Sequence, residues 1–132
     1  MTGNFRGPAR SGTVIYACDL GRLAGFYEAA LGMRRCFADA EHVVLELPDA
    51  QIVLHVIPPP FRALALAGSP AEPRMATAIK PFFSVPDFET VADAMSREGG
   101  ELYPEVWQGP GFRMRNGCDC EGNLIQLREW IS

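Results

Sequence analysis

The chain presents the same order of structural signals twice, and this repetition constrains the fold more than any other feature. In the first half, Thr13–Cys18 is rich in β-branched and aromatic residues and predicts a buried strand. Asp19 follows as a helix N-cap, and apolar residues then recur at helical spacing until Gly32, which predicts the end of the helix. Three further strands are predicted after it, at Met33–Phe37, Val43–Leu47 and Gln51–Ile57.

The second half repeats this order. Ala76–Val85 predicts a strand, Asp87 caps a second amphipathic helix, and Gly99-Gly100 ends that helix. The strands predicted after it are Glu101–Tyr103, Phe112–Cys118 and Asn123–Trp130. Two βαβββ units account for this order better than one irregular sheet, so we predict an α+β fold.

At 132 residues the chain is predicted to form one structural domain that contains both units. We place a flexible leader at residues 1–11, module 1 at residues 12–57 and module 2 at residues 76–132. The intervening residues 58–75 contain five prolines, which forbid a continuous helix or strand: Pro58, Pro59, Pro60, Pro70 and Pro73. We interpret this segment as the linker between the modules, and leave open a second role as a flap over a pocket.

Charge and hydropathy exclude nucleic acids and membranes as partners. The formal net charge is −4 and the Lys and Arg residues are scattered, so we expect no nucleic-acid partner. No apolar run approaches the roughly 20 residues needed to span a bilayer. The first residues lack the apolar segment of a signal peptide, which predicts a cytoplasmic location.

The cysteines are expected to be reduced core or strand residues, because they form no CxxC pair: Cys18, Cys36, Cys118 and Cys120. Cys118 and Cys120 share a strand face and could together coordinate a metal. No second Cys or His pair of metal-site spacing accompanies them, so we favour the structural interpretation.

Two segments carry a resemblance to a known family. Cys18–Met33 (CDLGRLAGFYEAALGM) resembles the strand–Asp–helix segment of the vicinal oxygen chelate superfamily, and Asp119–Leu127 (DCEGNLIQL) resembles its final hairpin and strand. The superfamily includes glyoxalase I, extradiol dioxygenases, fosfomycin-resistance proteins and bleomycin-resistance proteins. The resemblance covers residues 11–130 and implies that the modules curl into a partly open, barrel-like mixed sheet around a cleft, with the helices outside. It also implies a homodimer, because many members pair.

Enzymes of this superfamily hold a divalent metal at four strand positions, two in each module. Counting from the helix caps and from the Gly-Asn turn, the resemblance places Gly12, His55, Lys80 and Gln126 at these positions. Glycine offers no side-chain ligand, lysine must lose a proton before it binds a metal, and glutamine is a weak neutral donor. Since only His55 is a good ligand, we expect no metal cofactor.

Polar and aromatic residues nevertheless converge on one predicted sheet face, as in a ligand cleft, because side chains at i and i+2 share a face. The ligand-binding candidates are Tyr16, His55, Lys80, Phe82, Trp107 and Gln126. Each polar candidate has a structural alternative: a hydrogen-bonded strand histidine for His55, and a polar spacer for Gln126. Lys80 could reach water from a strand edge. Its apolar neighbours favour instead a buried cation that awaits an anionic ligand.

The aromatic candidates fit either the core or stacking against a planar ligand: Tyr16, Trp107 and Phe112. Trp107 has the better claim, because residues 106–111 predict a flexible loop beside the cleft. Arg113 and Arg115 share a strand face and could assist an anion, with solvated edge charges as the alternative.

The leading hypothesis is therefore a metal-free protein similar to the bleomycin-resistance type. It would bind a small organic molecule, anionic or aromatic, in the cleft between the modules. The alternative is a lyase, isomerase or extradiol-type dioxygenase, either metal-dependent or using His55 or Lys80 as a general base. A third hypothesis is a regulatory role with a vestigial cleft. Whether the chain is an enzyme stays open.

Overall fold

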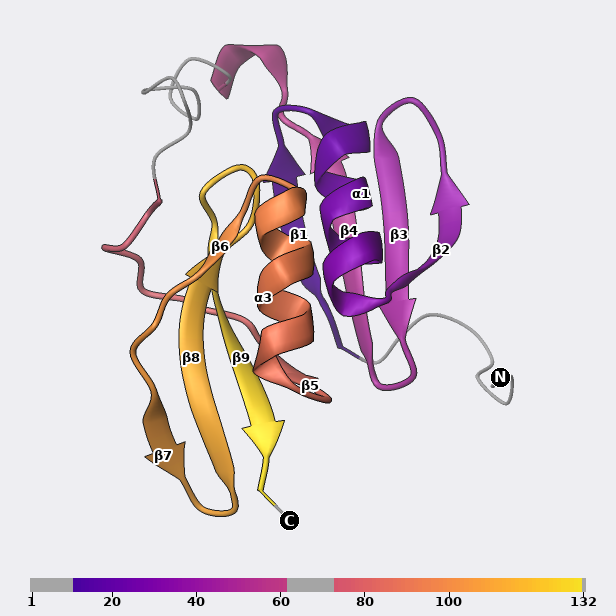
Figure 1. Ribbon diagram of the computed structural model, residues 1–132. Coiled ribbons are helices and arrows are strands. Elements are labelled where there is room, and N and C mark those ends of the chain that lie inside the picture. The colour runs from indigo at the N-terminus through magenta and orange to yellow at the C-terminus, as the bar shows by residue number, and fades with distance from the viewer. Residues whose placement is uncertain (1–10, 62–72, 132) are drawn as a thin grey trace.

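The computed structural model describes residues 11–61 and 73–131, and these form an α+β fold in which two α-helices accompany two mixed sheets (Figure 1). This confirms the predicted fold class. The sheets do not close into a barrel within this part of the chain. Most of the predicted leader (residues 1–10) and most of the predicted linker (residues 62–72) lie outside the described residues. Residues Pro59–Phe61, at the start of that linker, form a short 3₁₀ helix, η1.

The first sheet follows the predicted order of elements. After β1 (Thr13–Ala17) come α1 (Leu20–Leu31), β2 (Arg34–Ala38), β3 (His42–Leu47) and β4 (Ala50–Val56). The strand order is β1-β4-β3-β2. Strand β1 runs parallel to β4, which requires the crossover that α1 supplies, while the other neighbours are antiparallel.

The second sheet has the same topology with one added strand. It is built from β5 (Phe82–Val85), α3 (Phe88–Arg97), β6 (Glu101–Leu102), β7 (Trp107–Gly109), β8 (Phe112–Cys118) and β9 (Leu124–Trp130). The strand order is β5-β9-β8-β6, and β7 also pairs with β8. Strand β5 is parallel to β9, as β1 is to β4.

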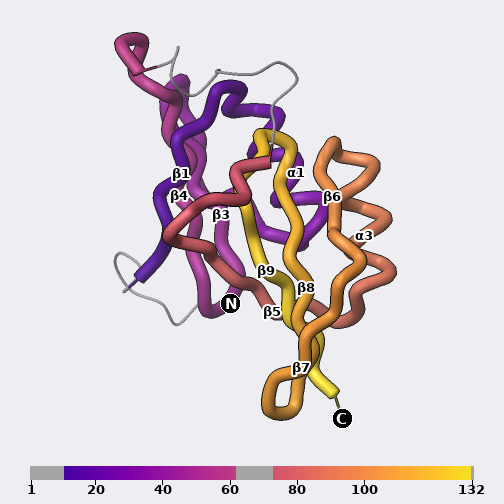
Figure 2. The backbone as a smooth tube through the Cα atoms, turned by 90° about the vertical axis from the view of Figure 1, so that its left-hand side faces the viewer, coloured from indigo at the N-terminus to yellow at the C-terminus, as the bar shows by residue number. Residues whose placement is uncertain are grey.

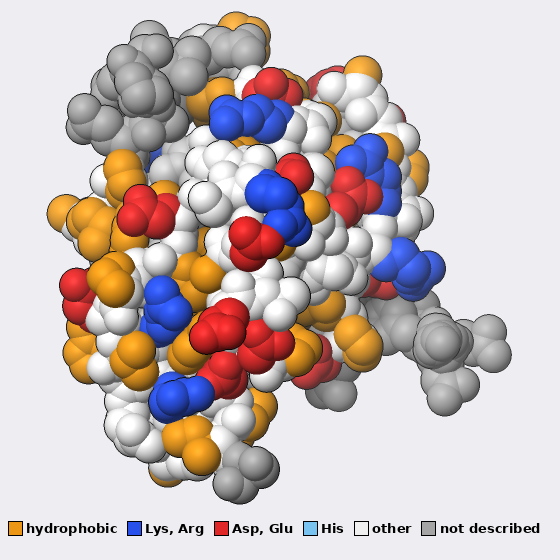
Figure 3. All heavy atoms as spheres, in the orientation of Figure 1, with side chains coloured by type: hydrophobic (Ala, Val, Ile, Leu, Met, Phe, Trp, Pro, Cys, Tyr) orange, Lys and Arg blue, Asp and Glu red, His pale blue; other side chains and the backbone are white. Residues whose placement is uncertain are grey.

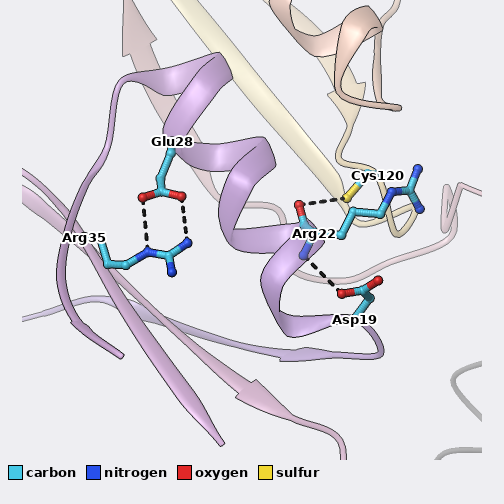
Figure 4. Close-up of polar contacts among 5 residues, drawn as sticks. All are labelled: Asp19, Arg22, Glu28, Arg35 and Cys120. Atoms are coloured by element: carbon cyan, nitrogen blue, oxygen red, sulfur yellow. Dashed lines mark hydrogen bonds and ion pairs between the residues drawn. The ribbon is translucent and has the colours of Figure 1, made fainter. Parts of the chain in front are cut away.

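Both helices begin at the aspartates that the sequence predicted. The side chain of Asp19 accepts a hydrogen bond from the backbone N–H of Arg22 at 3.1 Å (Figure 4), and Asp87 accepts one from the backbone N–H of Thr90 at 2.8 Å. Each bond satisfies an amide that has no partner within its helix. Helix α1 ends at Gly32, whose φ of 65° lies in the left-handed region that glycine enters without steric cost.

The two helices lie side by side and cover one face of each sheet (Figures 1 and 2). One hydrophobic core joins them, and its fully buried members come from both modules: Leu23, Phe26 and Tyr27 of α1, Met95 of α3, Leu54 of β4, and Ile125 and Leu127 of β9. On the outer side of this helical layer, positive and negative side chains are interspersed, and apolar side chains gather along the left rim of the view (Figure 3). No helix in the described part of the chain covers the opposite face of either sheet.

The hairpin between β8 and β9 joins the modules through buried carboxylates. The carboxylate of Asp119 accepts a bond from the hydroxyl of Tyr27 at 2.7 Å. The two carboxylate oxygens of Glu121 accept bonds from the backbone N–H groups of Cys18 and Asp19, each at 2.8 Å. Gly122, with a φ of 83°, makes the tight turn of the hairpin. The DCEGN sequence therefore attaches the hairpin of the second module to the strand–helix turn of the first module through these hydrogen bonds.

Two predicted elements differ from the structure. Strand β5 covers only Phe82–Val85 of the predicted Ala76–Val85, and Pro81 just before it has no N–H to donate to a ladder. Trp107–Gly109 lies in a strand and not in a flexible loop, because these residues pair with β8. The turn after them is made by Gly111, whose φ is 82°.

No disulfide joins the four cysteines: Cys118 and Cys120 are buried, Cys18 is half-buried, and Cys36 is exposed in β2. Among residues 11–61 and 73–131, no three His, Cys, Asp or Glu side chains are grouped so that they could hold a metal ion. The helices described here are too short or too polar to cross a membrane. The cytoplasmic location stays a prediction.

Candidate functional site

Strand alternation gives each sheet an open face, which we define as the face opposite the helices. In the first sheet this face carries Val14, Tyr16, His42, Val44, Val53 and His55. In the second sheet it carries Phe82, Ser84, Phe112, Met114, Asn116, Gln126, Arg128 and Trp130. The predicted convergence of polar and aromatic residues on one face of each sheet is present.

On the first sheet, His55 lies between two other rings. The ring centroids of Tyr16 and His55 are 5.6 Å apart, and those of His42 and His55 are 4.4 Å apart. His42 was not among the predicted site residues, although its place in the alternating HVVLEL strand indicates the same face as Val44. The ring nitrogen Nδ1 of His42 lies 3.2 Å from a carboxylate oxygen of Asp39. Hydrogen bonds from the backbone N–H of Glu41, then from His42, hold the pKa of Asp39 below its ordinary value.

The hydrogen bond of His55 determines its tautomer. Its Nδ1 lies 2.6 Å from the backbone carbonyl oxygen of Val56. A carbonyl oxygen only accepts, so Nδ1 must carry the proton. The other nitrogen of the neutral ring, Nε2, is then unprotonated and can accept a proton or a hydrogen bond.

On the second sheet, Arg128 is the central cation of the open face. Its guanidinium carbon lies 3.6 Å from the centroid of the Phe82 ring and 4.8 Å from that of Phe112. Its Nε donates a hydrogen bond to the side-chain oxygen of Gln126 at 3.0 Å. The predicted residues Phe82 and Gln126 therefore do meet, and they meet around an arginine that was not among the predicted site residues.

Lys80 is exposed, so the expectation of a buried cation is wrong. It precedes β5 and its ammonium donates to the side-chain oxygen of Asn116 at 3.0 Å. Asn116 faces Gln126 across the β8–β9 ladder, and Lys80 thus reaches the open face of the second sheet by its side chain.

The remaining candidates lie outside the contacts around Arg128. Trp107 is on the open face at the edge of the second sheet, in β7 opposite Met114, and it is about half-exposed. Arg113 and Arg115 lie on the helix side: Arg113 forms an ion pair with Glu129, and Arg115 donates to the carbonyl oxygen of Tyr103 at 2.8 Å. Neither arginine can assist an anion on the open face.

A groove of about 430 Å³ lies where the two sheets meet, between β1, residues 74–81 and the start of β9. Apolar side chains supply most of its wall, including Val14, Ile57, Ile79 and Leu124. Tyr16 also lines it, while the other five ligand-binding candidates lie outside its lining. An open, mainly apolar groove therefore lies between the modules, and Tyr16 is the predicted ligand-binding residue that it contains.

The comparisons with known proteins identify this arrangement of elements. No protein-family model and no curated protein sequence matches the chain. A glyoxalase/bleomycin resistance protein/dioxygenase family enzyme from Burkholderia phytofirmans superposes with a TM-score of 0.65 at 15% identity, covering 94% of this chain and 100% of that one. A glyoxalase/bleomycin resistance protein from Albidiferax ferrireducens gives 0.64 at 17% identity, covering 90% and 96%. A fosfomycin resistance protein from Listeria monocytogenes gives 0.65 at 14% identity, covering 94% of each chain.

The chain has the vicinal oxygen chelate fold. At these identities the likeness concerns the fold, which confirms the architecture that the sequence resemblance implied.

Within this vicinal oxygen chelate fold, the strand register relates the two modules differently from the count along the sequence. Tyr16 and Ser84 precede their helix caps by the same interval. Tyr16 lies beside His55 on β4, whereas Ser84 lies beside Arg128 on β9. The structural counterpart of His55 is therefore Arg128, and Gln126 lies earlier on the same face.

The four positions that the resemblance assigns to metal ligands do not fit a metal here. A Cβ atom added at Gly12 would lie 2.7 Å from a backbone oxygen of β4, so this position has no room for a ligating side chain. The oxygen of Gln126 is bonded to the cationic Arg128, and Lys80 carries a second positive charge onto the same face. His55 alone offers a suitable donor, and one strong ligand does not hold a catalytic metal.

Proposed function

We propose that this protein binds a small organic molecule, without a metal ion, in the cleft between its two modules. The observation that carries the proposal is the pair of open faces, where exposed rings lie beside positioned polar groups and no helix of the described residues covers them. Tyr16 is 56% exposed and Phe82 is 53% exposed. Fully burying a large apolar side chain contributes about 1.5–3 kcal/mol, so a ligand that covers these rings gains substantial affinity.

Polar groups beside these rings would orient the ligand. His55 offers Nε2 on the first sheet, and Arg128, Lys80 and Gln126 present polar groups on the second. The groove itself is lined by Tyr16 and mainly apolar side chains, so a ligand that extends from it onto the open faces meets both apolar surface and fixed polar groups, which is the usual composition of a small-molecule site. Fosfomycin resistance and bleomycin resistance proteins, which bear drug names, share the fold.

We also propose that two copies of the chain form a homodimer. Large apolar side chains that the ligand proposal does not use are also exposed, including Phe37, Phe61 and Val106. Exposed apolar side chains mark interaction sites where they gather into a patch. Sedimentation velocity should give a dimer, and a monomer at all concentrations would contradict this part of the proposal.

Native mass spectrometry of protein purified without chelators tests the ligand proposal. We expect an excess mass that corresponds to an organic molecule, together with substoichiometric metal by elemental analysis. Stoichiometric zinc, iron, nickel or manganese that disappears in a His55→Gln variant would overturn the metal-free proposal. The matched control is His42→Gln, which removes the neighbouring imidazole.

A second candidate function is metal-free enzyme chemistry in which His55 acts as a general base. In the neutral ring, its Nδ1–H bond to the Val56 carbonyl leaves Nε2 as the nitrogen that can accept a proton. Incubating the protein with its copurified ligand in D₂O would reveal exchange of an activated C–H by NMR. Exchange should be lost in His55→Gln and kept in His42→Gln, and equal exchange in both variants would exclude His55 as the base.

A further inference from the structure

The open face of the second sheet holds two cations that have no carboxylate partner among residues 11–61 and 73–131. Other arginines are neutralised: Arg34, Arg35, Arg97 and Arg113 each form an ion pair with Asp or Glu. Arg128 and Lys80 instead contact the amide oxygens of Gln126 and Asn116. An amide oxygen accepts a hydrogen bond without cancelling the charge, so both side chains keep their full positive charge.

Arg128 is also held in one orientation. The ring of Phe82 lies against one side of the guanidinium, Phe112 lies close by, and Gln126 fixes Nε. Within residues 11–61 and 73–131, no acceptor contacts the two terminal nitrogens of Arg128. These terminal N–H groups form the planar fork that binds a carboxylate through two parallel hydrogen bonds. Because the side chain is already ordered, less entropy is lost when an anion binds.

No acidic residue of strands β5, β8 and β9 faces this cluster. Their open-face side chains are apolar, hydroxyl, thiol, amide or cationic. The nearest carboxylate along β9 is that of Glu129, which points to the helix side, where it accepts a bond from the backbone N–H of Phe88 and pairs with Arg113. An anion on the open face would therefore meet two positive charges and no repelling carboxylate from these strands, although the whole chain has a net charge of −4.

The surroundings of the two cations define the rest of the ligand. Phe82 is 53% exposed and Trp130 is 63% exposed. The Trp130 ring packs against Phe112 with a centroid distance of 5.3 Å. The rings of Phe82, Phe112 and Trp130 therefore form an apolar surface that extends beyond the guanidinium of Arg128. A ligand that fills both parts has a carboxylate at one end and a flat apolar body behind it.

We propose that the open face of the second sheet recognises a planar organic carboxylate, with Arg128 binding the carboxylate as a fork and Lys80 adding a second positive charge. The inference rests on the proposed function, since it names the chemical class of the molecule bound there. Arg128 determines specificity for the anion, while Phe82 and Trp130 bind the apolar body.

Titration with 2-naphthoate and with its neutral analogue 2-naphthamide tests this inference, because the two probes differ in charge and hardly in shape. Side-chain NMR signals of Arg128 Nε–H and of the Gln126 and Asn116 amides report binding at the cluster. We expect naphthoate to shift these signals and to bind at least about tenfold more tightly than naphthamide, as charge-assisted bidentate hydrogen bonds require.

Variants separate charge from fork geometry. Arg128→Gln should reduce naphthoate affinity about tenfold and leave naphthamide nearly unchanged, whereas Arg128→Lys should recover part of the affinity through charge alone. Lys80→Gln should cost less, about threefold, because Lys80 is exposed and its charge is screened. Arg34→Gln is the matched control, since it removes an exposed arginine from the other sheet.

Each remaining outcome overturns the inference. Equal affinity for the acid and the amide would mean that Arg128 only packs against Phe82, and ligand binding by the cleft would still stand. Absence of binding by either probe would also overturn it, and the excess mass found by native mass spectrometry would then decide the proposed function separately. Equal losses in Arg128→Gln and Arg34→Gln would assign the effect to overall charge.

Discussion

The hydroxyl of Tyr27 donates a hydrogen bond of 2.7 Å to a carboxylate oxygen of Asp119, and both side chains are fully buried. The bond joins α1 of the first module to the β8–β9 hairpin of the second. Asp119 also accepts bonds from Asn123 and from the backbone N–H of Glu121, so its charge is distributed over several donors. A buried carboxylate with this many donors organises the contact between the modules.

Tyr27→Phe should lower the free energy of unfolding by about 1.5–3 kcal/mol, because it removes a buried hydrogen bond to a charged group. Urea denaturation followed by circular dichroism measures this change. Tyr16→Phe is the control: its side chain is exposed, and we expect a change within about 0.5 kcal/mol. Equal stability of the two variants would contradict the structural role of the bond.

The stability of the protein should fall as the pH rises into the alkaline range. Burial, then the charge of Asp119, raises the pKa of Tyr27 above its ordinary value of 10.0, and burial raises the pKa of Cys120 from 9.0 to about 12. In the unfolded chain these groups lose their protons at their ordinary pKa values. The unfolded state then binds fewer protons than the folded state, so unfolding becomes more favourable as pH increases above about 9.

Thermal unfolding between neutral and strongly alkaline pH would check this dependence. The decline should be shallower in Tyr27→Phe, because that variant lacks one of the groups with a raised pKa. A slope that Tyr27→Phe and Cys120→Ala leave unchanged would assign the alkaline loss to other groups.

Glu121→Gln should weaken the hydrogen bonds that join the β8–β9 hairpin to the first module. Both carboxylate oxygens of Glu121 accept backbone hydrogen bonds, and an amide NH₂ cannot accept one. We expect a loss of about 1–3 kcal/mol and faster hydrogen exchange at the amides of Cys18 and Asp19. Glu105→Gln, at an exposed carboxylate, should change neither quantity. Unaltered exchange at both amides in Glu121→Gln would contradict the role of Glu121 in joining the modules.

The tautomer of His55 can be checked directly. Long-range ¹⁵N NMR at a pH where the ring is neutral should show a protonated Nδ1 and an unprotonated Nε2, because Nδ1 faces a carbonyl oxygen. The opposite tautomer would contradict the hydrogen bond to Val56 and remove the basis for His55 as a general base.

Much of the architecture could be predicted because its signals are local. The caps at Asp19 and Asp87, the stop at Gly32 and the strand Phe112–Cys118 all follow from residues close in sequence. The alternation of side chains also placed Tyr16, His55 and Gln126 on an open face. Pro81 could have indicated that the strand before Asp87 is short, because proline cannot donate to a ladder.

The site could be predicted only in part, because several of the contacts that define it cross between strands. Trp107 pairs with Met114 of β8, and this pairing converts a predicted loop into an edge strand. Gln126 was predicted as a ligand contact, with a polar spacer as the alternative, whereas its side-chain oxygen accepts a hydrogen bond from Arg128. The pairing of Trp107 joins two strands, whereas Gln126 and Arg128 lie two residues apart on one face of β9, so strand alternation could have indicated that contact.

The sequence by itself determined the repeated βαβββ order, the ends of both helices and the faces of the strands, since each depends on neighbours a few residues apart. Only the tertiary structure decided that Lys80 is exposed, that Arg128 and not Gln126 is the counterpart of His55, and that Arg128 lies on Phe82. These facts depend on the register between strands distant in sequence. That register is set by backbone hydrogen bonds and core packing across the whole sheet.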